Sequence, residues 1–300
     1  MADYIIGSFN TQNLNLRSDS AQKKDFEKIA EIIEKEKFDI VALQETITEI
    51  AINQIERHLP NYWIHDFNQE NGRPDISDDD EDQIKSKNSA KGFTFLWNSR
   101  RFEECSKDNR AQFEPVKGHI VRRPFVGRFA PINGPFCEIR LINIHLCNPN
   151  NFKDMKLQEY AAVADLYDRI YSDRKYGNNR AAYTLILGDY NIPLRYCLEC
   201  EEMHNLSIKA FLGGDDRPNE KTTLITQDTY QKAIDQGIQP FIFANDFDHC
   251  SYNESYFQDR NIKIEVKRIN SVEVYCENDF IVHRKSISDH VPIKIELSLR

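Results

Sequence analysis

The chain has 300 residues, of which 40% are hydrophobic and 29% charged, and its formal net charge is −9 at pH 7. This is ordinary globular composition, and a chain of this length can bury a large core. No apolar run approaches the roughly 18 residues of a membrane helix, so the sequence excludes a membrane span and indicates no stable membrane association. The negative charge argues against binding a polyanion by bulk charge, but it leaves room for a local basic groove.

The first residues lack the basic start and long apolar stretch of a secretory signal, which predicts a cytoplasmic protein. The seven cysteines agree, because an odd and scattered set is not typical of a disulfide framework. Cys197 and Cys200, with His204 beyond them, resemble half of a zinc site, but no second pair of matching spacing follows. We therefore expect reduced, structural thiols, and the role of Cys197 and Cys200 stays open.

Short apolar runs and amphipathic stretches alternate in the first third of the chain. Phe26, Ile29 and Ile33 fall on one stripe of residues 20–37, which predicts a helix. The apolar run 39–43 is typical of a strand covered on both faces. Further strands are expected at 4–9 and 62–67, and a second helix at 49–59. Six acidic residues between 75 and 82 predict a solvated, mobile loop at about 68–91, where calcium is disfavoured because no glycine breaks the cluster at EF-hand spacing.

The rest of the chain is richer in predicted strands, with one long helix at 152–174 and a mixed, mostly helical stretch at 193–237. The strands are expected at 93–97, 125–130, 136–145, 184–187, 241–243, 262–269, 279–283 and 291–299. No repeat and no linker rich in Pro, Gly or Ser divides the chain, so we predict a single domain over residues 1–300. Strands and helices interleave without a strict βαβ rhythm, which indicates an α/β fold with more than one sheet.

Polar residues stand at the ends of five apolar strands, where a rigid strand can hold a ligand in place. They are Asn10, Gln44-Glu45, His145, Asp189 with Asn191, and Ser288-Asp289-His290. Each alone is typical of a turn, a helix cap or a structural histidine. Their order along the chain and their occurrence together favour a functional site.

Six short segments carry a resemblance to a known family. They are Ser8-Phe9-Asn10, Leu43-Gln44-Glu45-Thr46, Asn143-Ile144-His145-Leu146, Gly188-Asp189-Tyr190-Asn191, Phe247-Asp248-His249 and Ser288-Asp289-His290. In this order, from the first strand to the last, the chain resembles the endonuclease/exonuclease/phosphatase superfamily, of which deoxyribonuclease I is a familiar member. The resemblance implies an α/β (α+β) four-layer sandwich, with two packed mixed β-sheets flanked by helices. It also implies a divalent metal, usually Mg²⁺ with Mn²⁺ as an alternative, and hydrolysis of a phosphate ester.

The acidic motifs supply oxygen ligands of the kind that Mg²⁺ prefers. Glu45 is the natural direct ligand, with Asn10 and Asp289 beside it. Asp189 and Asn191 stand two apart, so in extended backbone their side chains would project to the same side. The resemblance implies that Asp189 orients or deprotonates the attacking water and that Asn191 holds the phosphate. An Asx-turn after the strand is the alternative, but it accounts for only one of the two.

Two histidines complete the predicted site. The resemblance implies that His290 contacts the scissile phosphate or acts as a base, with Asp248 holding its imidazole. His145 would protonate or hydrogen-bond the leaving oxygen, and it argues against abasic-site repair, because the superfamily's repair enzymes lack a histidine there. One departure concerns His145: deoxyribonuclease I orients this histidine with a glutamate, and Lys91-Gly92 occupy that place here.

Arg122 and Asn143 are expected to touch the substrate phosphate, with Arg128 as an alternative to Arg122. The segment Arg122-Arg123-Pro124 is similar to an arginine-bearing segment of deoxyribonuclease I, although a solvated basic turn explains it equally well.

Three functions compete. The favoured one is a metal-dependent phosphodiesterase, an endonuclease acting on DNA, with RNA as an alternative partner. The second is a phosphatase or phosphodiesterase of inositol phosphates or phospholipid head groups, although no basic cluster or membrane-docking loop stands out for it. The third is a catalytically inactive binding domain, which the intact motifs disfavour.

Overall fold

The structure is a computed structural model, and it describes residues 3–16, 23–69, 91–106, 108, 110–118, 120–147, 153–172, 180–212 and 220–299. Most of the predicted acidic loop at 68–91 lies outside the described residues. Of that range, Asn68 and Gln69 end a strand and Lys91 directly precedes the next one.

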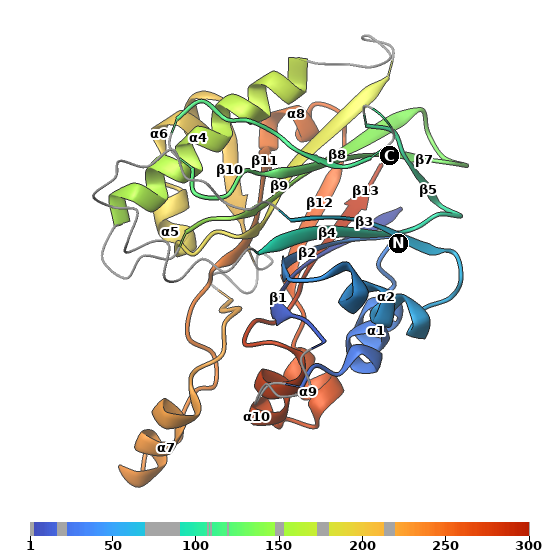
Figure 1. Cartoon of the computed structure of the whole chain (residues 1–300). Helices are drawn as coiled ribbons and strands as arrows, with labels where there is room; N and C mark the ends of the chain where they lie inside the picture. Colours follow the sequence, from blue (N-terminus) through green and yellow to red (C-terminus); the bar gives the residue numbers. More distant parts are fainter. Residues whose placement is uncertain are drawn as a thin grey trace.

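Two mixed β-sheets form the centre of the molecule (Figure 1). The first has the order β12-β13-β1-β2-β4-β3, with β1 parallel to β2 and antiparallel to β13. Its strands are β1 (Tyr4–Leu14), β2 (Ile40–Thr46), β3 (Trp63–Gln69), β4 (Gly92–Asn98), β12 (Lys263–Arg268) and β13 (Ile293–Ser298). The first and last described strands are therefore neighbours in one sheet.

The second sheet has the order β10-β11-β9-β8-β7-β5, and β6 pairs with β7 beside this path. Only β8 and β9 run parallel among its described neighbours. Its strands are β5 (Phe102–Glu104), β6 (Gln112–Phe113), β7 (Phe125–Pro131), β8 (Cys137–His145), β9 (Ala181–Asp189), β10 (Ile208–Phe211) and β11 (Asp248–Asn253).

The two sheets pack face to face through aromatic side chains. Phe95 of β4 stacks on Phe125 of β7 at 5.3 Å between ring centroids and meets Phe129 edge-on at 5.4 Å. These rings belong to one buried cluster that includes residues of both sheets, such as Ile6 of β1 and Ile142 of β8. Removal of this apolar surface from water is the main force that holds the sheets together.

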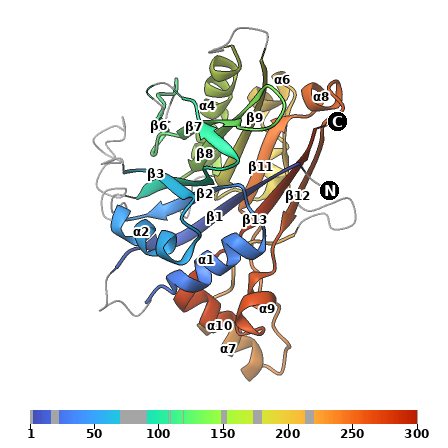
Figure 2. The same ribbon diagram turned by 90° about the vertical axis from the view of Figure 1, so that its right-hand side faces the viewer.

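Helices cover the outer faces of both sheets (Figures 1 and 2). On the first sheet, α1 (Phe26–Lys35) and α2 (Glu49–His58) bury Ile29, Ile33 and Ile52 with Phe9 and Val41 of the strands. Asp25 caps α1 by accepting a hydrogen bond from the Lys28 amide at 2.9 Å. On the second sheet lie α4 (Lys153–Ser172), α5 (Leu194–Cys197) and α6 (Glu201–Asn205). The predicted four-layer sandwich is confirmed.

The remaining described helices lie at the edges of the sandwich. They are α7 (Gln227–Asp235), α8 (Glu254–Gln258), α9 (Ser271–Cys276), α10 (Phe280–Val282) and a π-helical turn (His283–Ile287). Figure 1 shows α7 at the tip of an arm that projects away from the sandwich. In the described part of the chain, no helix combines the length and apolar character needed to cross a membrane.

Two predicted strands are wrong. Residues 279–283 form α10 and the start of the π-helical turn, because the Asp279 carboxylate accepts hydrogen bonds from the Ile281 and Val282 amides and so caps a helix. Residues 241–243 contribute only an isolated bridge between Leu224 and Phe243. The strand β11, which begins at Asp248, was not expected.

Candidate active site

The strands bring the predicted site residues to one edge of the sandwich. In the second sheet, the register places His145 at the end of β8 beside Asp189 at the end of β9. Asp248 at the start of β11 lies opposite Asp189. In the first sheet, Asn10 of β1 lies beside Gln44 of β2, one residue before Glu45. Segments far apart in the sequence meet here. Asn10 Nδ2 donates a hydrogen bond to Asp189, and Ser288 Oγ, 278 positions from Asn10, donates to the Asn10 carbonyl.

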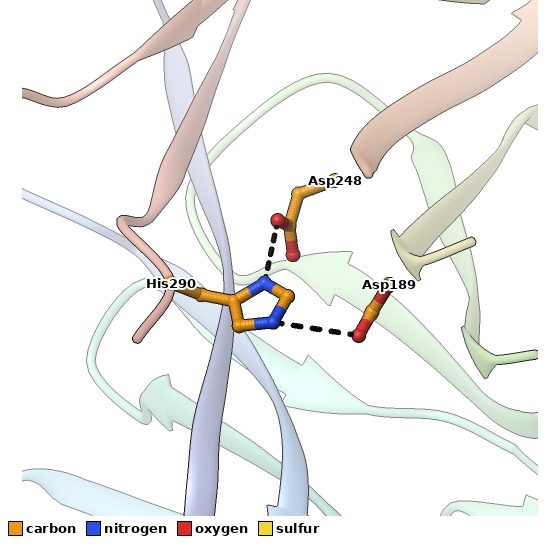
Figure 3. A group of neighbouring side chains, drawn as sticks. All are labelled: Asp189, Asp248 and His290. Atoms are coloured by element: carbon orange, nitrogen blue, oxygen red, sulfur yellow. Dashed lines mark hydrogen bonds and ion pairs between the residues drawn. The ribbon is translucent and has the colours of Figure 1, made fainter. Parts of the chain in front are cut away.

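His290 is held between two buried carboxylates (Figure 3). Its Nδ1 lies 2.8 Å from Asp248 Oδ2, and its Nε2 lies 3.7 Å from Asp189 Oδ2. Burial alone would lower the pKa of His290, but the charges of Asp248 and Asp189 outweigh it and raise the pKa to about 10. The imidazole is therefore charged at neutral pH, and its Nδ1–H donates to Asp248.

Within the described ranges, one group of three acidic, cysteine or histidine side chains has all of its ligand atoms within 4.8 Å of one another. It consists of Asp189, Asp248 and His290. A charged imidazole carries a proton on both nitrogens and cannot coordinate a metal. Metal binding by this group would therefore require His290 to lose a proton, whereas in the present arrangement its imidazole lies between the two carboxylates. Cys197 and Cys200 are buried and belong to no such group among the described residues.

His145 is buried and neutral. Its Nε2 lies 3.6 Å from both Glu45 Oε1 and Asp189 Oδ2, which is too far for a good hydrogen bond. Burial, with the nearby charges of Arg122 and Lys91, holds the pKa of His145 well below its ordinary value. Its Nδ1 is buried and has no hydrogen-bond partner among the residues that the structure describes. This is consistent with the replacement of the orienting glutamate by Lys91.

Glu45 ends β2 in a left-handed backbone conformation, with φ at 60°. Its Oε2 lies 2.7 Å from Lys91 Nζ and accepts a hydrogen bond from the Asn13 amide at 3.1 Å. Its Oε1 accepts a long hydrogen bond from Asn10 Nδ2 at 3.4 Å. Burial would raise the pKa of Glu45, but the charge and hydrogen bond of Lys91, with the charges of Arg122 and His290, together outweigh burial and hold the pKa below its ordinary value. Glu45 is thus a buried carboxylate that stays ionised.

The predicted extended geometry of Asp189 and Asn191 is wrong. Asn191 has φ at 51°, and its amide donates to Asp189 Oδ1 at 2.9 Å, so the chain makes an Asx-turn after β9. Asn191 Nδ2 donates to the Leu146 carbonyl at 2.9 Å, and Lys156 Nζ donates to the Asn191 carbonyl. The turn nevertheless leaves Asp189 Oδ2 facing Asn10 and both histidines.

The two residues predicted to touch phosphate lie in different surroundings. Arg122 donates to the carbonyls of His145 and Leu146 at 3.1 and 3.3 Å, so its guanidinium is fixed beside the site. Asn143 is fully buried, and its amide joins the sheets by accepting from Gln44 Nε2 at 2.7 Å and donating to the Leu43 carbonyl. Arg128, the alternative, pairs with Arg140 in the register of β7 and β8, several residues from His145.

Two cations beside the site are not signalled by the sequence. Arg284 lies 3.3 Å from Asp289 Oδ2, and Lys24 Nζ donates to the Ile287 carbonyl at 2.8 Å. Burial lowers the pKa of Lys24 to about 8, against the opposing charges of Asp289 and Glu45. These residues come from distant segments that only the fold brings together.

The donor set fits a hard divalent cation. Glu45 and Asp189 are ionisable oxygen donors joined by Asn10 Nδ2, which lies 3.4 Å from one and 2.8 Å from the other. Carboxylate and amide oxygens are the ligands that Mg²⁺ prefers, and thiolates are absent from the described site. Asn10 Oδ1 accepts from the Gln12 amide, so Asn10 in this arrangement positions the carboxylates.

No family model matches the sequence, and no curated protein matches it. Solved structures do match. An endonuclease/exonuclease/phosphatase family protein from Bacteroides thetaiotaomicron gives a TM-score of 0.60 at 14% identity, over 99% of this chain and 98% of that one. The chain has the endonuclease/exonuclease/phosphatase fold. The resemblance that the motifs indicate is therefore confirmed at the level of the fold.

Two other structures with this fold are similar to the chain to the same degree. The mannosyl-6-phosphatase of Bacteroides thetaiotaomicron gives a TM-score of 0.59 at 15% identity, over 99% of this chain and 100% of that one. D. rerio TDP2 complexed with single strand DNA product gives 0.58 at 12% identity, over 98% of both chains. At such identities the endonuclease/exonuclease/phosphatase fold is what the chains share.

Proposed function

We propose that the chain is a metal-dependent phosphodiesterase, an endonuclease that hydrolyses DNA. The observation that carries this proposal is the buried pair of Asp248 and His290, which holds the imidazole Nε2 3.7 Å from the Asp189 carboxylate. In-line attack on a phosphate ester needs a proton acceptor for the nucleophile and cationic donors for the charge that develops on oxygen. The site supplies both in one buried place.

Asp189 takes the proton of the attacking water in this proposal. Burial raises the pKa of Asp189 above its ordinary value, although the charge of His290 opposes this, and a raised pKa makes a carboxylate a better proton acceptor. Asn10 fixes the carboxylate by donating to its Oδ2 at 2.8 Å. Asn191, in the turn after Asp189, holds the phosphate.

The two histidines act on the phosphate oxygens. His290 is charged and donates a hydrogen bond to an oxygen of the scissile phosphate, while Asp248 fixes its orientation. His145 is neutral but still carries one N–H, with which it hydrogen-bonds the leaving oxygen. Arg122 adds a fixed positive charge beside His145.

Glu45 would hold Mg²⁺ or Mn²⁺, with Asn10 and Asp289 beside it. A bound divalent ion neutralises charge on the phosphate in the transition state.

The basic residues around the acidic centre support a polyanionic substrate, because phosphate contacts dominate nucleic-acid affinity. The DNA complex of D. rerio TDP2, which has the same fold, favours DNA. A second candidate function, hydrolysis of a phosphorylated sugar, inositol or lipid head group, is favoured by the similar mannosyl-6-phosphatase.

The proposal includes one domain over residues 1–300 and a cytoplasmic location. One buried cluster contains residues from Tyr4 to Leu297, which supports a single core. All seven cysteines are free and buried, which suits a reducing compartment.

The test is to incubate the purified protein with supercoiled plasmid, RNA, mannose 6-phosphate, inositol phosphates and sphingomyelin, each with Mg²⁺ or with EDTA. We expect nicked plasmid in Mg²⁺ and intact plasmid in EDTA. Hydrolysis of a small phosphate ester with plasmid left intact would select the second function.

A further inference from the structure

The ammonium of Lys91 contacts Glu45, the carboxylate that would hold the metal in the proposed function. Its Nζ lies 2.7 Å from Glu45 Oε2, and the two side chains are only 16% and 10% exposed. The Asn13 amide donates to the same oxygen at 3.1 Å. Glu45 Oε2 is therefore held by two donors of the chain itself.

The backbone fixes Lys91 beside Glu45. Gly92 begins β4 and pairs with Thr46 on one side and Gln69 on the other. A Cβ at Gly92 would lie 2.7 Å from the Thr46 carbonyl oxygen and 2.8 Å from that of Asn68, so the close approach of the three strands requires glycine. Lys91 directly precedes Gly92, and Glu45 directly precedes Thr46. The pairing of Gly92 with Thr46 therefore holds Lys91 close enough for its ammonium to contact Glu45.

We propose that Lys91 is an internal cation that competes with a divalent metal for Glu45, so that the metal enters only when the ammonium leaves. This inference rests on the metal dependence in the proposed function. Two cations cannot share one carboxylate oxygen at contact distance without strong repulsion. Leaving Glu45 without a partner would be costly in this buried place, which explains why the chain supplies an ammonium. The pair therefore weakens metal affinity and keeps the carboxylate ordered while no metal is bound.

The test is a titration of the full chain with Mn²⁺, in which electron paramagnetic resonance measures the free ion. The informative variant is Lys91→Met, which removes the charge and keeps the length of the side chain. Lys294→Met is the matched control, because Lys294 Nζ lies 2.7 Å from Glu36 Oε2 with side chains 17% and 18% exposed. Glu45→Gln identifies binding at the proposed site. Lys91→Arg retains the competing charge.

We expect Lys91→Met to lower the Kd for Mn²⁺ about tenfold or more, which corresponds to the loss of one close charge pair. Lys294→Met and Lys91→Arg should bind as the parent does. If Mn²⁺ binding depends on Glu45 but is unchanged in Lys91→Met, the proposed competition by Lys91 is wrong, while the metal assignment of Glu45 stands. Failure of Glu45→Gln to weaken binding, or no Mn²⁺ binding at all, would overturn both the metal assignment in the proposed function and the competition.

A second measurement uses the unaltered protein and does not depend on the folding of any variant. Amine acylation followed by mass spectrometry reports how accessible Lys91 is with and without Mn²⁺. If the metal displaces the ammonium, acylation of Lys91 becomes several-fold faster at saturating Mn²⁺, while that of Lys294 does not change. Equal labelling of Lys91 in both conditions would contradict the displacement.

Discussion

His290 Nδ1 donates a hydrogen bond to Asp248 Oδ2 over 2.8 Å, and Asp248 is fully buried. The Asp248 amide in turn donates to Thr222 Oγ1 at 3.1 Å. The backbone of the next residue, Thr223, forms an isolated antiparallel β-bridge with His290. The pair is therefore fixed from both sides. Because the carboxylate stabilises the charged imidazole, the proton state of His290 depends on Asp248.

Asp248→Asn should lower the rate of phosphate-ester hydrolysis by roughly one to two orders of magnitude, because the imidazole loses the charge that keeps it protonated. The pKa of His290 should fall from its raised value, which a proton NMR titration of the histidine rings can follow. The matched control is Glu56→Gln, since Glu56 Oε1 lies 2.7 Å from His65 Nδ1 in a similar pair on α2 and β3. A variant with unchanged rate and unchanged pKa would contradict the role of Asp248.

His145→Ala should lower kcat by roughly two orders of magnitude, less than the loss of His290, because His145 is neutral and its Nδ1 lacks a partner among the described residues. Initial rates at saturating substrate measure the effect, and circular dichroism checks the fold. A kcat equal to that of the parent would remove His145 from the proposed chemistry.

Substitutions of Arg122 and of Arg128 distinguish the predicted arginine contact to phosphate from its alternative. Arg122→Ala should lower kcat/KM about tenfold or more, because it removes a fixed charge beside His145. Arg128→Ala should leave kcat/KM near the parent value, since Arg128 lies towards the other end of β8. The reverse order of effects would assign the phosphate contact to Arg128.

The burial of His283 should make the stability of the protein depend on pH. Its Nε2 lies 2.7 Å from Ser271 Oγ and its Nδ1 lies 2.8 Å from the Ser288 carbonyl oxygen. Burial lowers the pKa of His283 to about 4, so its ring is neutral in the fold and gains a proton more readily when unfolded. The neutral His283 therefore contributes fully to the free energy of unfolding above about pH 6.5. This contribution of up to about 3 kcal/mol is lost as the pH falls towards 4.

Urea unfolding at several pH values tests this dependence. The free energy of unfolding should fall between pH 6.5 and 4, and His283→Gln should reduce the slope. A parent and a variant with the same slope would show that His283 does not titrate in this range.

The strand ends of the site were predictable from the sequence because each polar residue follows an apolar run. Glu45 and Asp189 stand at or next to the carboxyl ends of β2 and β9, whereas Asn10 lies inside β1, which continues to Leu14, and pairs with Gln44 beside Glu45. Only the fold, however, shows that Asn10 donates to Asp189. The contact depends on how the two sheets pack, which no local pattern encodes.

Other features were beyond the sequence for identifiable reasons. Phe280, Ile281 and Val282 form an apolar run that is typical of a strand, but the Asp279 cap makes it helical. The pairing of Lys91 with Glu45 depends on the register in which Gly92 meets Thr46. Asn191 lies within the turn and has a positive φ, which an asparagine tolerates, so the alternation of side chains along extended backbone does not apply there.

The role of His290 in phosphodiester hydrolysis is tested most directly by comparing His290→Ala with His65→Ala on plasmid DNA and on bis(4-nitrophenyl) phosphate in Mg²⁺. Both variants remove a buried or half-buried imidazole that is paired with a carboxylate at 2.7–2.8 Å, but only His290 belongs to the proposed site. We expect His290→Ala to lower the initial rate by roughly two to four orders of magnitude and His65→Ala to keep the parent rate. Equal rates for the folded His290→Ala variant and the parent would contradict the assignment of this cluster as a phosphodiesterase site.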